Sequence, residues 1–185
     1  MSYLKPQKGR LLIAEPSILN DSSFNRAIIL ITEHTDNNSV GFILNRPLDY
    51  TLQDLLPEIE SDFVIYQGGP VEQDNLYFVH QVPELIPESI KVDNGIFWGG
   101  NFESLKKLLS DGSLNKNDIR FFLGYSGWGK NQLEDELNSN SWFISENDIK
   151  NIFSKNEESL WKNKILQQGG DYKLWANAQS DINLN

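Results

Sequence analysis

Short apolar runs separated by polar turns dominate the first half of the chain. Residues 11–14, 27–31 and 40–44 are almost entirely apolar and contain many Ile, Leu and Val residues, a pattern that favours buried strands. The polar stretch 36–39 supplies turn-forming residues between the second and third runs, so these two runs predict a β-hairpin. Shorter runs of the same kind predict further strands at 63–66, 76–80, 89–92, 96–98, 119–123 and 142–144.

Helical spacing is clearest after residue 100. Asn101 stands at an N-cap position before a stripe of apolar residues, and Gly112 follows where a left-handed C-cap favours glycine. A second helix is predicted after residue 129, because Leu133 and Leu137 stand four residues apart. These two helices flank the predicted strand at 119–123.

Two further helices have weaker patterns. Thr51 can cap a short helix that ends before Pro57. Near the C-terminus, acidic residues begin and basic residues end a helix that stops at Gly169, an order that complements the helix dipole. The polar tail that follows is expected to pack through three side chains, Tyr172, Leu174 and Trp175.

These elements predict an α+β fold with a largely antiparallel sheet. Strands outnumber helices, and the first strands are joined by short turns rather than by crossover helices. No internal repeat or low-complexity linker interrupts the chain, so residues 1–185 are expected to form a single domain.

Charge and composition exclude several classes of function. The chain has 16 Lys and Arg residues against 26 Asp and Glu residues, a net charge of −10. Nucleic-acid binding requires clustered cations, and the longest basic run is the pair Lys106–Lys107. Direct nucleic-acid binding is therefore disfavoured. The absence of cysteine excludes disulfides, thiolate nucleophiles and cysteine-based zinc sites.

Targeting signals are also missing from the pattern. No apolar run approaches the roughly 18–20 residues that span a bilayer. Residues 11–14 are too short a run for the apolar core of a signal peptide. We therefore expect no membrane association and, by default, a cytoplasmic location.

The segment from Gly124 to Asn131 nearly matches the phosphate-binding loop G-x-x-x-x-G-K-[ST], between a predicted strand and a predicted helix. That loop needs a hydroxyl residue to bind Mg²⁺, and Asn131 stands in its place. Tyr125 and Trp128 are also bulky for a loop that wraps a triphosphate. The alternatives are a glycine-rich turn whose aromatic side chains fill the core, or a simple anion site at the following helix N-terminus.

The same segment nearly matches the nucleophile elbow G-x-S-x-G, with Ser126 as the nucleophile. Trp128 replaces the final glycine, and both histidines, His34 and His80, precede the serine, against the usual order of that fold. A serine nucleophile stays an alternative, because convergent triads ignore chain order.

The signal for a metal site is weak. His34 and His80 could share a metal with Glu33 or Asp36, but the histidines lack the close spacing of metal-binding motifs. Histidines satisfied at strand ends are the favoured interpretation, so neither a metal nor a cofactor is predicted.

Arg26 and Arg46 stand at the ends of predicted strands in an acidic chain. Each calls for a buried carboxylate partner or for an anionic ligand. Structural pairing is the favoured interpretation of the two.

Several further motifs follow one another in a characteristic order. They are Gly9–Pro16; Asp21, Phe24 and Arg26; Glu33–His34; Gly41–Pro47; Gly68–Val71; Phe122–Trp128; and Gln132–Leu137. Taken together, these motifs resemble those of the YqgE/AlgH family of bacterial proteins over nearly the whole chain.

The resemblance implies a bent, bifurcated sheet that curls into a pseudo-barrel with helices outside. It implies no settled activity. One member gave the family the label of transcriptional regulator, through an effect on exopolysaccharide production. With a net charge of −10 and no recognisable helix-turn-helix, any such regulation is expected to be indirect.

The chain departs from the family pattern at a few positions. The family usually has Pro and Gly where this chain has Lys130 and Asn131, and Pro where it has Ser22. The lysine that completes the apparent phosphate-binding loop is therefore not a family feature. The family also accepts alanine at the position of Ser126, which argues against a nucleophile there.

The leading hypothesis is a non-enzymatic binding protein with an indirect regulatory role. One pocket would hold a small anionic ligand or a segment of a protein partner. The candidate ligand-binding residues lie at predicted strand ends and in the family motifs: Asp21, Arg26, Asn45, Arg46, Gly68, Gly69, Tyr125, Gly127, Trp128 and Gln132.

Two other classes of function stay open. A hydrolase would use Asp21, His34 or Glu134 as acid or base within the same pocket. A regulator acting directly on DNA would need a basic surface stripe, which the net charge disfavours.

Overall fold

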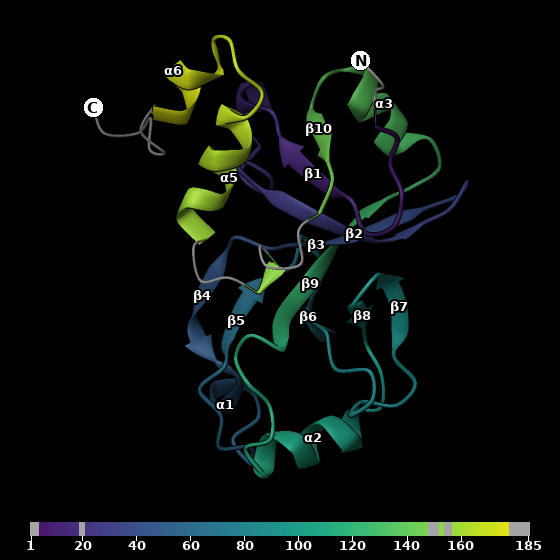
Figure 1. Ribbon diagram of the computed structural model, residues 1–185, viewed down its shortest axis with the longest axis vertical. Helices are drawn as coiled ribbons and strands as arrows, with labels where there is room; N and C mark the ends of the chain where they lie inside the picture. The colour runs from purple at the N-terminus through teal and green to yellow at the C-terminus, as the bar shows by residue number, and fades with distance from the viewer. Residues whose placement is uncertain (1–3, 19–20, 148–151, 154–156, 178–185) are drawn as a thin grey trace.

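The computed structural model describes residues 4–18, 21–147, 152–153 and 157–177 (Figure 1). The strands are β1 (Leu11–Ala14), β2 (Ile28–His34), β3 (Ser39–Ile43), β4 (Pro47–Thr51), β5 (Val64–Gln67), β6 (Val71–His80), β7 (Ile90–Asp93), β8 (Ile96–Trp98), β9 (Ile119–Trp128) and β10 (Trp142–Ser145). The helices are the 3-10 turn η1 (Pro16–Ile18) and α1 (Leu52–Leu55), α2 (Phe102–Ser110), α3 (Gln132–Asn138), α5 (Glu157–Leu166) and α6 (Tyr172–Asn177).

The described strands form one sheet that branches at β9. A path of paired strands runs β10-β1-β2-β3-β9-β6-β8-β7. β4 and β5 lie outside this path. β5 pairs with β4 on one edge and with the first half of β9 on the other. The pair of β5 and β9 is parallel, and the other pairs are antiparallel. The predicted α+β class with a bifurcated, largely antiparallel sheet is confirmed.

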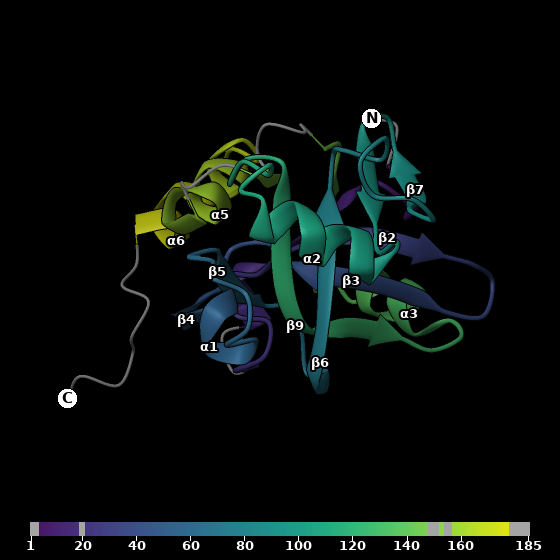
Figure 2. The same ribbon diagram turned by 90° about the horizontal axis from the view of Figure 1, so that it is seen from below.

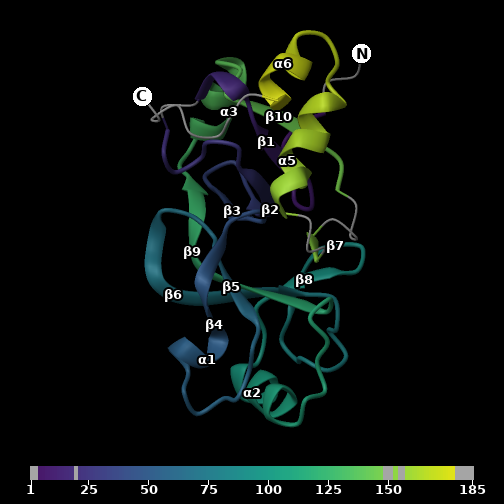
Figure 3. The same cartoon turned by 90° about the vertical axis from the view of Figure 1, so that its left-hand side faces the viewer.

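The sheet is strongly bent but does not close into a barrel. In Figure 2, β2 and β3 run horizontally, whereas β6 and the first half of β9 run vertically. Within the described part of the chain, the path of paired strands has two free ends, β10 and β7. The pseudo-barrel that the resemblance implied is thus an open sheet with helices at its periphery. Figure 3 shows α3, α5 and α6 near β1 and β10, and α1 and α2 at the opposite end.

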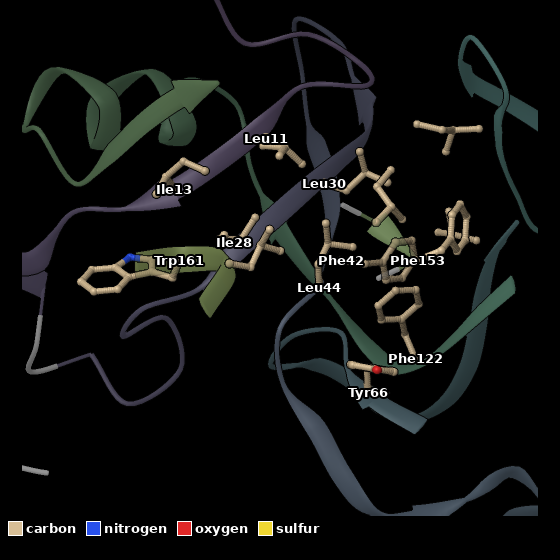
Figure 4. Packing of buried hydrophobic residues seen from close by; sticks show 14 of the residues in the cluster. Leu11, Ile13, Ile28, Leu30, Phe42, Leu44, Tyr66, Phe122, Phe153 and Trp161 are labelled. Carbon is tan, nitrogen blue, oxygen red and sulfur yellow. The ribbon is translucent and has the colours of Figure 1, made fainter. Parts of the chain in front are cut away.

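Both faces of β1 and β2 are buried, which explains their continuous apolar runs. Leu11 and Leu30 point into a cluster with Phe42, Phe122 and the α5 residue Trp161 (Figure 4). The alternate residues of the same strands enter a second cluster with Trp128 and Trp142. A third cluster fills the space between α1, α2 and the first half of β9.

β9 continues through the segment that the sequence predicted as a glycine-rich loop. Residues 126–128 pair with β3, and Tyr125 pairs with Val71 of β6. The prediction of a strand at 119–123 followed by a loop at 124–129 is therefore wrong in its second part. At Gly124 the carbonyl oxygens of Gly69 and Val71 approach the strand closely.

The C-terminal prediction is confirmed for one side chain of three. Tyr172 packs edge-on against Phe143, with ring centroids 5.3 Å apart. Leu174 and Trp175 instead remain 77% and 43% exposed, and Ala176 is the buried residue of α6. Residues 178–185 of the predicted tail lie outside the described residues. Among the described helices, none has the length and apolar character needed to cross a membrane.

Candidate functional site

The Gly68–Gly69 motif lets the chain cross over β9. Residues 121–123 of β9 pair with β5 and with β6, so these two strands lie on opposite edges of β9. Only residues 68–70 join β5 to β6, and they must pass over the face of β9. A Cβ atom on Gly68 would lie 2.2 Å from the carbonyl oxygen of Gly124, and one on Gly69 would lie 2.2 Å from the carbonyl carbon of Tyr125. The motif is therefore required for a backbone crossing.

Ser126 is part of this crossing and is not positioned as a nucleophile. Its side chain is fully buried, and its Oγ donates a hydrogen bond to the carbonyl oxygen of Gly68 over 3.1 Å. Gly124 to Trp128 belong to strand β9. Both the phosphate-binding-loop and the nucleophile-elbow interpretations are thereby contradicted, because each needs an exposed turn here.

Asn45 and Arg46 clamp the turn that precedes β2. Asn45 accepts a hydrogen bond from the Ile28 amide and donates one to the carbonyl of Arg26, both over 2.9 Å. Arg46 donates from Nη2 to the carbonyl oxygen of Asn25 over 2.8 Å and from Nη1 to those of Ser22 and Ser23.

The observed partners of Arg46 differ from the carboxylate expected from the sequence. Arg46 serves a structural role, but its hydrogen bonds go to carbonyl oxygens rather than to a carboxylate. Burial lowers the pKa of Arg46, and the charge of Asp21 partly opposes that shift. Asp21 itself accepts a hydrogen bond from the Ser23 amide over 2.9 Å. The guanidinium of Arg26 lies over the Trp161 ring, 5.1 Å from its centroid.

Trp128 and Gln132 belong to a network centred on Glu136. One carboxylate oxygen accepts the indole N–H groups of Trp128 and Trp142 over 2.8 and 2.7 Å. The other accepts from Nε2 of Gln132, whose Oε1 accepts from the Gly129 amide. The ring of Phe24 packs against both indoles, with centroid distances of 6.2 and 5.4 Å.

The structure therefore places eight of the ten candidate residues in these three local networks and leaves Tyr125 and Gly127 outside them. Tyr125 and Trp128 point to opposite faces of β9: Tyr125 packs on Tyr77 beside the cluster of Phe42, whereas Trp128 lies in the cluster of Ile29. Gly127 is half-buried on the same face as Tyr125. The ligand-binding roles of these residues remain predictions.

The histidines are satisfied locally, as favoured from the sequence. Nδ1 of His34 lies 2.8 Å from the Ser39 hydroxyl. His80 is fully buried and hydrogen-bonds to Gly99 and Ser89. Among the described residues, no group of three or more His, Cys, Asp or Glu side chains is arranged to hold a metal ion.

The three candidate acid–base residues lie apart. Asp21 bonds within its own turn, His34 bonds to Ser39, and Glu134 is exposed on α3. In the part of the chain that the structure describes, no hydrogen bond links any two of them. The hydrolase alternative therefore keeps no paired acid and base.

An open groove of about 710 Å³ runs between α3 and the turn after η1. Two of the candidate residues, Asp21 and Gln132, line it together with Phe24, Glu136 and Trp142. Its described lining includes two carboxylates and no Lys or Arg side chain. This groove therefore does not suit the anionic ligand that the sequence indicated.

A more enclosed cavity of about 350 Å³ lies where the start of β9 meets β4 and β5. Its volume falls within the usual range of small-molecule sites. The lining is mostly apolar and aromatic, with two cationic side chains. The described lining residues are Pro47, Phe63, Val64, Tyr66, Lys116, Ile119, Arg120 and Phe153.

Arg120 is the buried polar group of this cavity. Its side chain is 5% exposed, and its guanidinium lies over the Tyr66 ring, 4.2 Å from the centroid. Nη1 donates to the carbonyl oxygen of Leu44 over 2.7 Å. Lys116 reaches the cavity from the surface, where it pairs with Asp62.

These cavity residues are not among the site residues predicted from the sequence, although one signal was present. Arg120 is the only charged residue in the apolar run 119–123. A charge at a position that the pattern predicts to be buried indicates a special role. Tyr66 and Lys116 carry no comparable signal, because only the pairing of β5 with β9 brings them near Arg120.

The fold and the cavity define an α+β protein with a branched sheet and a pocket of small-molecule size. The chain belongs to the AlgH-like family, whose sequence model DUF179 matches residues 11–173. A UPF0301 protein of Cytophaga hutchinsonii is 42% identical over 180 residues, which cover 96% of this chain and 98% of the relative. A UPF0301 protein of Parabacteroides distasonis is 37% identical over 183 residues, covering 97% and 92%.

Two solved structures are similar over almost their whole length. The solution structure of AlgH from Pseudomonas aeruginosa has a TM-score of 0.72 and 23% identity, and the match covers 97% of this chain and 98% of AlgH. A crystal structure of a Corynebacterium diphtheriae protein has a TM-score of 0.76 and 21% identity, with coverages of 96% and 95%. At these identities the similarity shows the fold alone.

Proposed function

We propose that this protein is a non-enzymatic binding protein that holds a small anionic ligand in the cavity beside Arg120. The observation that carries the proposal is the position of that guanidinium, almost fully buried in the wall of a cavity of about 350 Å³. Burial removes a charge from water at a large cost. An anion in the cavity would gain from a charge that is already positioned and desolvated.

The lining of the cavity narrows the chemistry of the ligand. Arg120 and Lys116 are its described charged residues, and both are cationic. A guanidinium matches the planar geometry of carboxylate and phosphate groups. Phe63, Ile119 and Phe153 offer apolar surface for the rest of the molecule. We therefore expect a carboxylate or phosphate ligand with a compact body.

The negative charge of the chain bears on where an anion could bind. A chain of net charge −10 repels anions at long range. Affinity for an anion would therefore require a local site. A binding protein of this kind would act on gene expression indirectly, through the ligand or a partner.

The first test is a thermal-shift screen of the purified protein against inorganic phosphate, benzoate, acetate, gluconate and ribose 5-phosphate. A ligand at 100 times its Kd stabilises the folded state by about 2.7 kcal/mol. For a protein of this size that corresponds to a rise of about 5–10 °C in Tm. A Tm that stays unchanged with all five anions would contradict the proposal.

Three variants locate the site. Arg120→Lys and Lys116→Gln should each weaken binding of the active anion about three- to tenfold, a factor that corresponds to about 0.7–1.4 kcal/mol. Lys116 is 44% exposed, so its replacement leaves the fold intact. The control Lys130→Gln removes an exposed cation beyond the end of β9 and should leave the affinity unchanged. Equal losses in all three variants would indicate binding through general charge.

A further inference from the structure

Aromatic side chains form much of the wall of the Arg120 cavity. Three of its eight described lining residues are aromatic, and they come from separate parts of the chain: Phe63 precedes β5, Tyr66 lies in β5, and Phe153 precedes α5. Phe63 packs edge-on against Phe121, with ring centroids 5.6 Å apart, and Tyr66 and Phe153 are 8% and 5% exposed. Packing of this kind fixes the rings in position. The cavity therefore offers a ligand preformed aromatic surfaces.

Few polar side chains line the cavity. Within its described lining they are Arg120, Lys116 and the hydroxyl-bearing Tyr66. The first two are the cations assigned to the anionic group of the ligand. A ligand body with several hydroxyl groups would lose its contacts with water and find few new hydrogen-bond partners, which costs free energy for each unsatisfied group. An apolar body is therefore favoured over a sugar or a polyol.

A ring suits this cavity better than a flexible aliphatic chain. Aromatic rings pack edge-on or offset against other rings and gain attraction beyond that of the area they bury. A rigid ring also has few rotatable bonds to immobilise, whereas a chain loses rotational freedom when it binds. Both effects favour an aromatic body.

The anionic end needs no rearrangement at Lys116. This residue pairs with Asp62 at the surface, where its side chain is 44% exposed. An ammonium group has three N–H donors, so it can contact Asp62 and a ligand at the same time. The other cation, Arg120, is already oriented by the Leu44 carbonyl and by the Tyr66 ring. Its planar guanidinium matches the shape of a carboxylate.

We propose that the ligand is a small aromatic carboxylate. Its carboxylate binds at Arg120 and Lys116, and its ring packs against Phe63 and Phe153. This inference rests on the proposed function, because the carboxylate is the anion assigned to the Arg120 cavity. It adds the chemical class of the ligand body.

The test compares the Kd values of four carboxylates, measured by NMR titration. Acetate has the anionic group alone, gluconate adds a hydroxylated chain, and cyclohexanecarboxylate has a saturated ring in place of the aromatic ring of benzoate. We expect benzoate to bind at least about tenfold more tightly than acetate or gluconate, because only its body buries apolar surface without unsatisfied hydroxyls. Benzoate should also bind about two- to tenfold more tightly than cyclohexanecarboxylate, the range for a contact between rings. Equal affinities for these two would overturn the inference.

Phe63→Leu removes one ring of the wall and keeps an apolar side chain. It should reduce the preference for benzoate over cyclohexanecarboxylate about two- to fivefold and leave the Kd of acetate unchanged. The matched control is Phe102→Leu, at a residue of α2 that is 39% exposed and outside the described lining. The control should change neither value. A preference that survives in full in Phe63→Leu would contradict the proposed ring contact.

Ring-current shifts give a readout that needs no variant. Val64 and Ile119 line the cavity and carry methyl groups. At saturation, bound benzoate should shift the ¹H signals of these methyl groups more than bound cyclohexanecarboxylate does, because only the aromatic ring has a ring current. Shifts of equal size with the two carboxylates would count against an aromatic ring beside these residues.

The outcomes separate this inference from the proposed function. If inorganic phosphate or acetate binds and Arg120→Lys weakens that binding, but benzoate binds no more tightly than acetate, the aromatic class is refuted and the proposed function stands. If none of these anions binds, both proposals fail.

Discussion

At the scale of single residues, the hydrogen bonds of buried His80 determine the tautomer of its neutral ring. Its Nδ1 lies 3.3 Å from the Val82 amide, which donates to it. The proton of the neutral ring therefore sits on Nε2, which faces the Gly99 carbonyl at 3.1 Å and the Ser89 hydroxyl at 3.0 Å. In this tautomer the imidazole cannot accept a proton from Ser89, so the two residues do not form a nucleophile–base pair.

His80 also gives a prediction about pH. Burial lowers its pKa from the ordinary value of 6.5, and the Gly99 carbonyl and the charge of Glu84 only partly oppose the shift. Below pH 6.5 the unfolded chain binds a proton that the folded protein does not, so stability should fall as the pH falls toward the lowered pKa. The slope for one proton is at most about 1.4 kcal/mol per pH unit. Above pH 6.5 this residue should contribute no slope.

Urea denaturation at a series of pH values between 7.5 and 5 measures this slope. His80→Gln should remove the part of it that belongs to the imidazole. The matched control is His34→Gln, which replaces the other histidine of the chain. An unchanged slope in His80→Gln would show that the acid sensitivity comes from carboxylates.

Arg46 shows where residue patterns reach their limit. The position of Arg46 at a strand end correctly indicated a structural role, but the sequence could not tell a carboxylate partner from a backbone one. The turn from Asp21 to Arg26 presents three carbonyl oxygens to the Arg46 guanidinium. Those oxygens come from a local backbone conformation that no residue pattern specifies.

At the scale of elements, β9 decides the architecture. Its residues 121–123 hold a strand on each edge, and residues 126–128 hold β3. The apolar run 119–123 was recognised, but three glycines in the following positions read as a loop. Gly124 has a φ of +68°, and a Cβ there would lie 2.7 Å from the carbonyl oxygens of Gly69 and Val71. Gly124 therefore reflects backbone crowding, which sequence alone does not distinguish from a turn.

The crossing of residues 68–70 over β9 predicts that a methyl group added at Gly68 strongly destabilises the fold. Gly68→Ala should lower the free energy of unfolding by about 1–3 kcal/mol or more, because its Cβ meets fixed backbone at 2.2 Å and overpacking of this kind is costly. The control Gly129→Ala places a Cβ whose nearest neighbour is the Gln132 side chain at 4.0 Å, so it should change stability by less than about 0.5 kcal/mol. Chemical denaturation compares the two. Equal stabilities would contradict the crossing.

At the scale of the whole molecule, the elements were more predictable than their assembly. The apolar runs located most strands, and the N-cap residues located α1 and α2. The parallel pairing of β5 with β9 could not be foreseen, because β5 precedes β9 by some fifty residues and carries no signal of its partner. The motif residues take part in the Asn45–Arg46 clamp, the crossing at Gly68–Gly69 and the Glu136 network, and their predicted ligand-binding roles stay predictions. The cavity is formed by side chains that this long-range pairing brings together.

The most direct test of this account is a two-dimensional ¹H–¹⁵N NMR titration with the anion that raises Tm most in the screen. We predict that the amide signals of residues 64–66 and 116–120 shift with a common Kd, and that Lys116→Gln weakens that Kd. Signals of residues 124–132, in the motif segment, should stay in place. Shifts confined to the motif segment, or the absence of saturable shifts, would contradict the assignment of the ligand site to the Arg120 cavity.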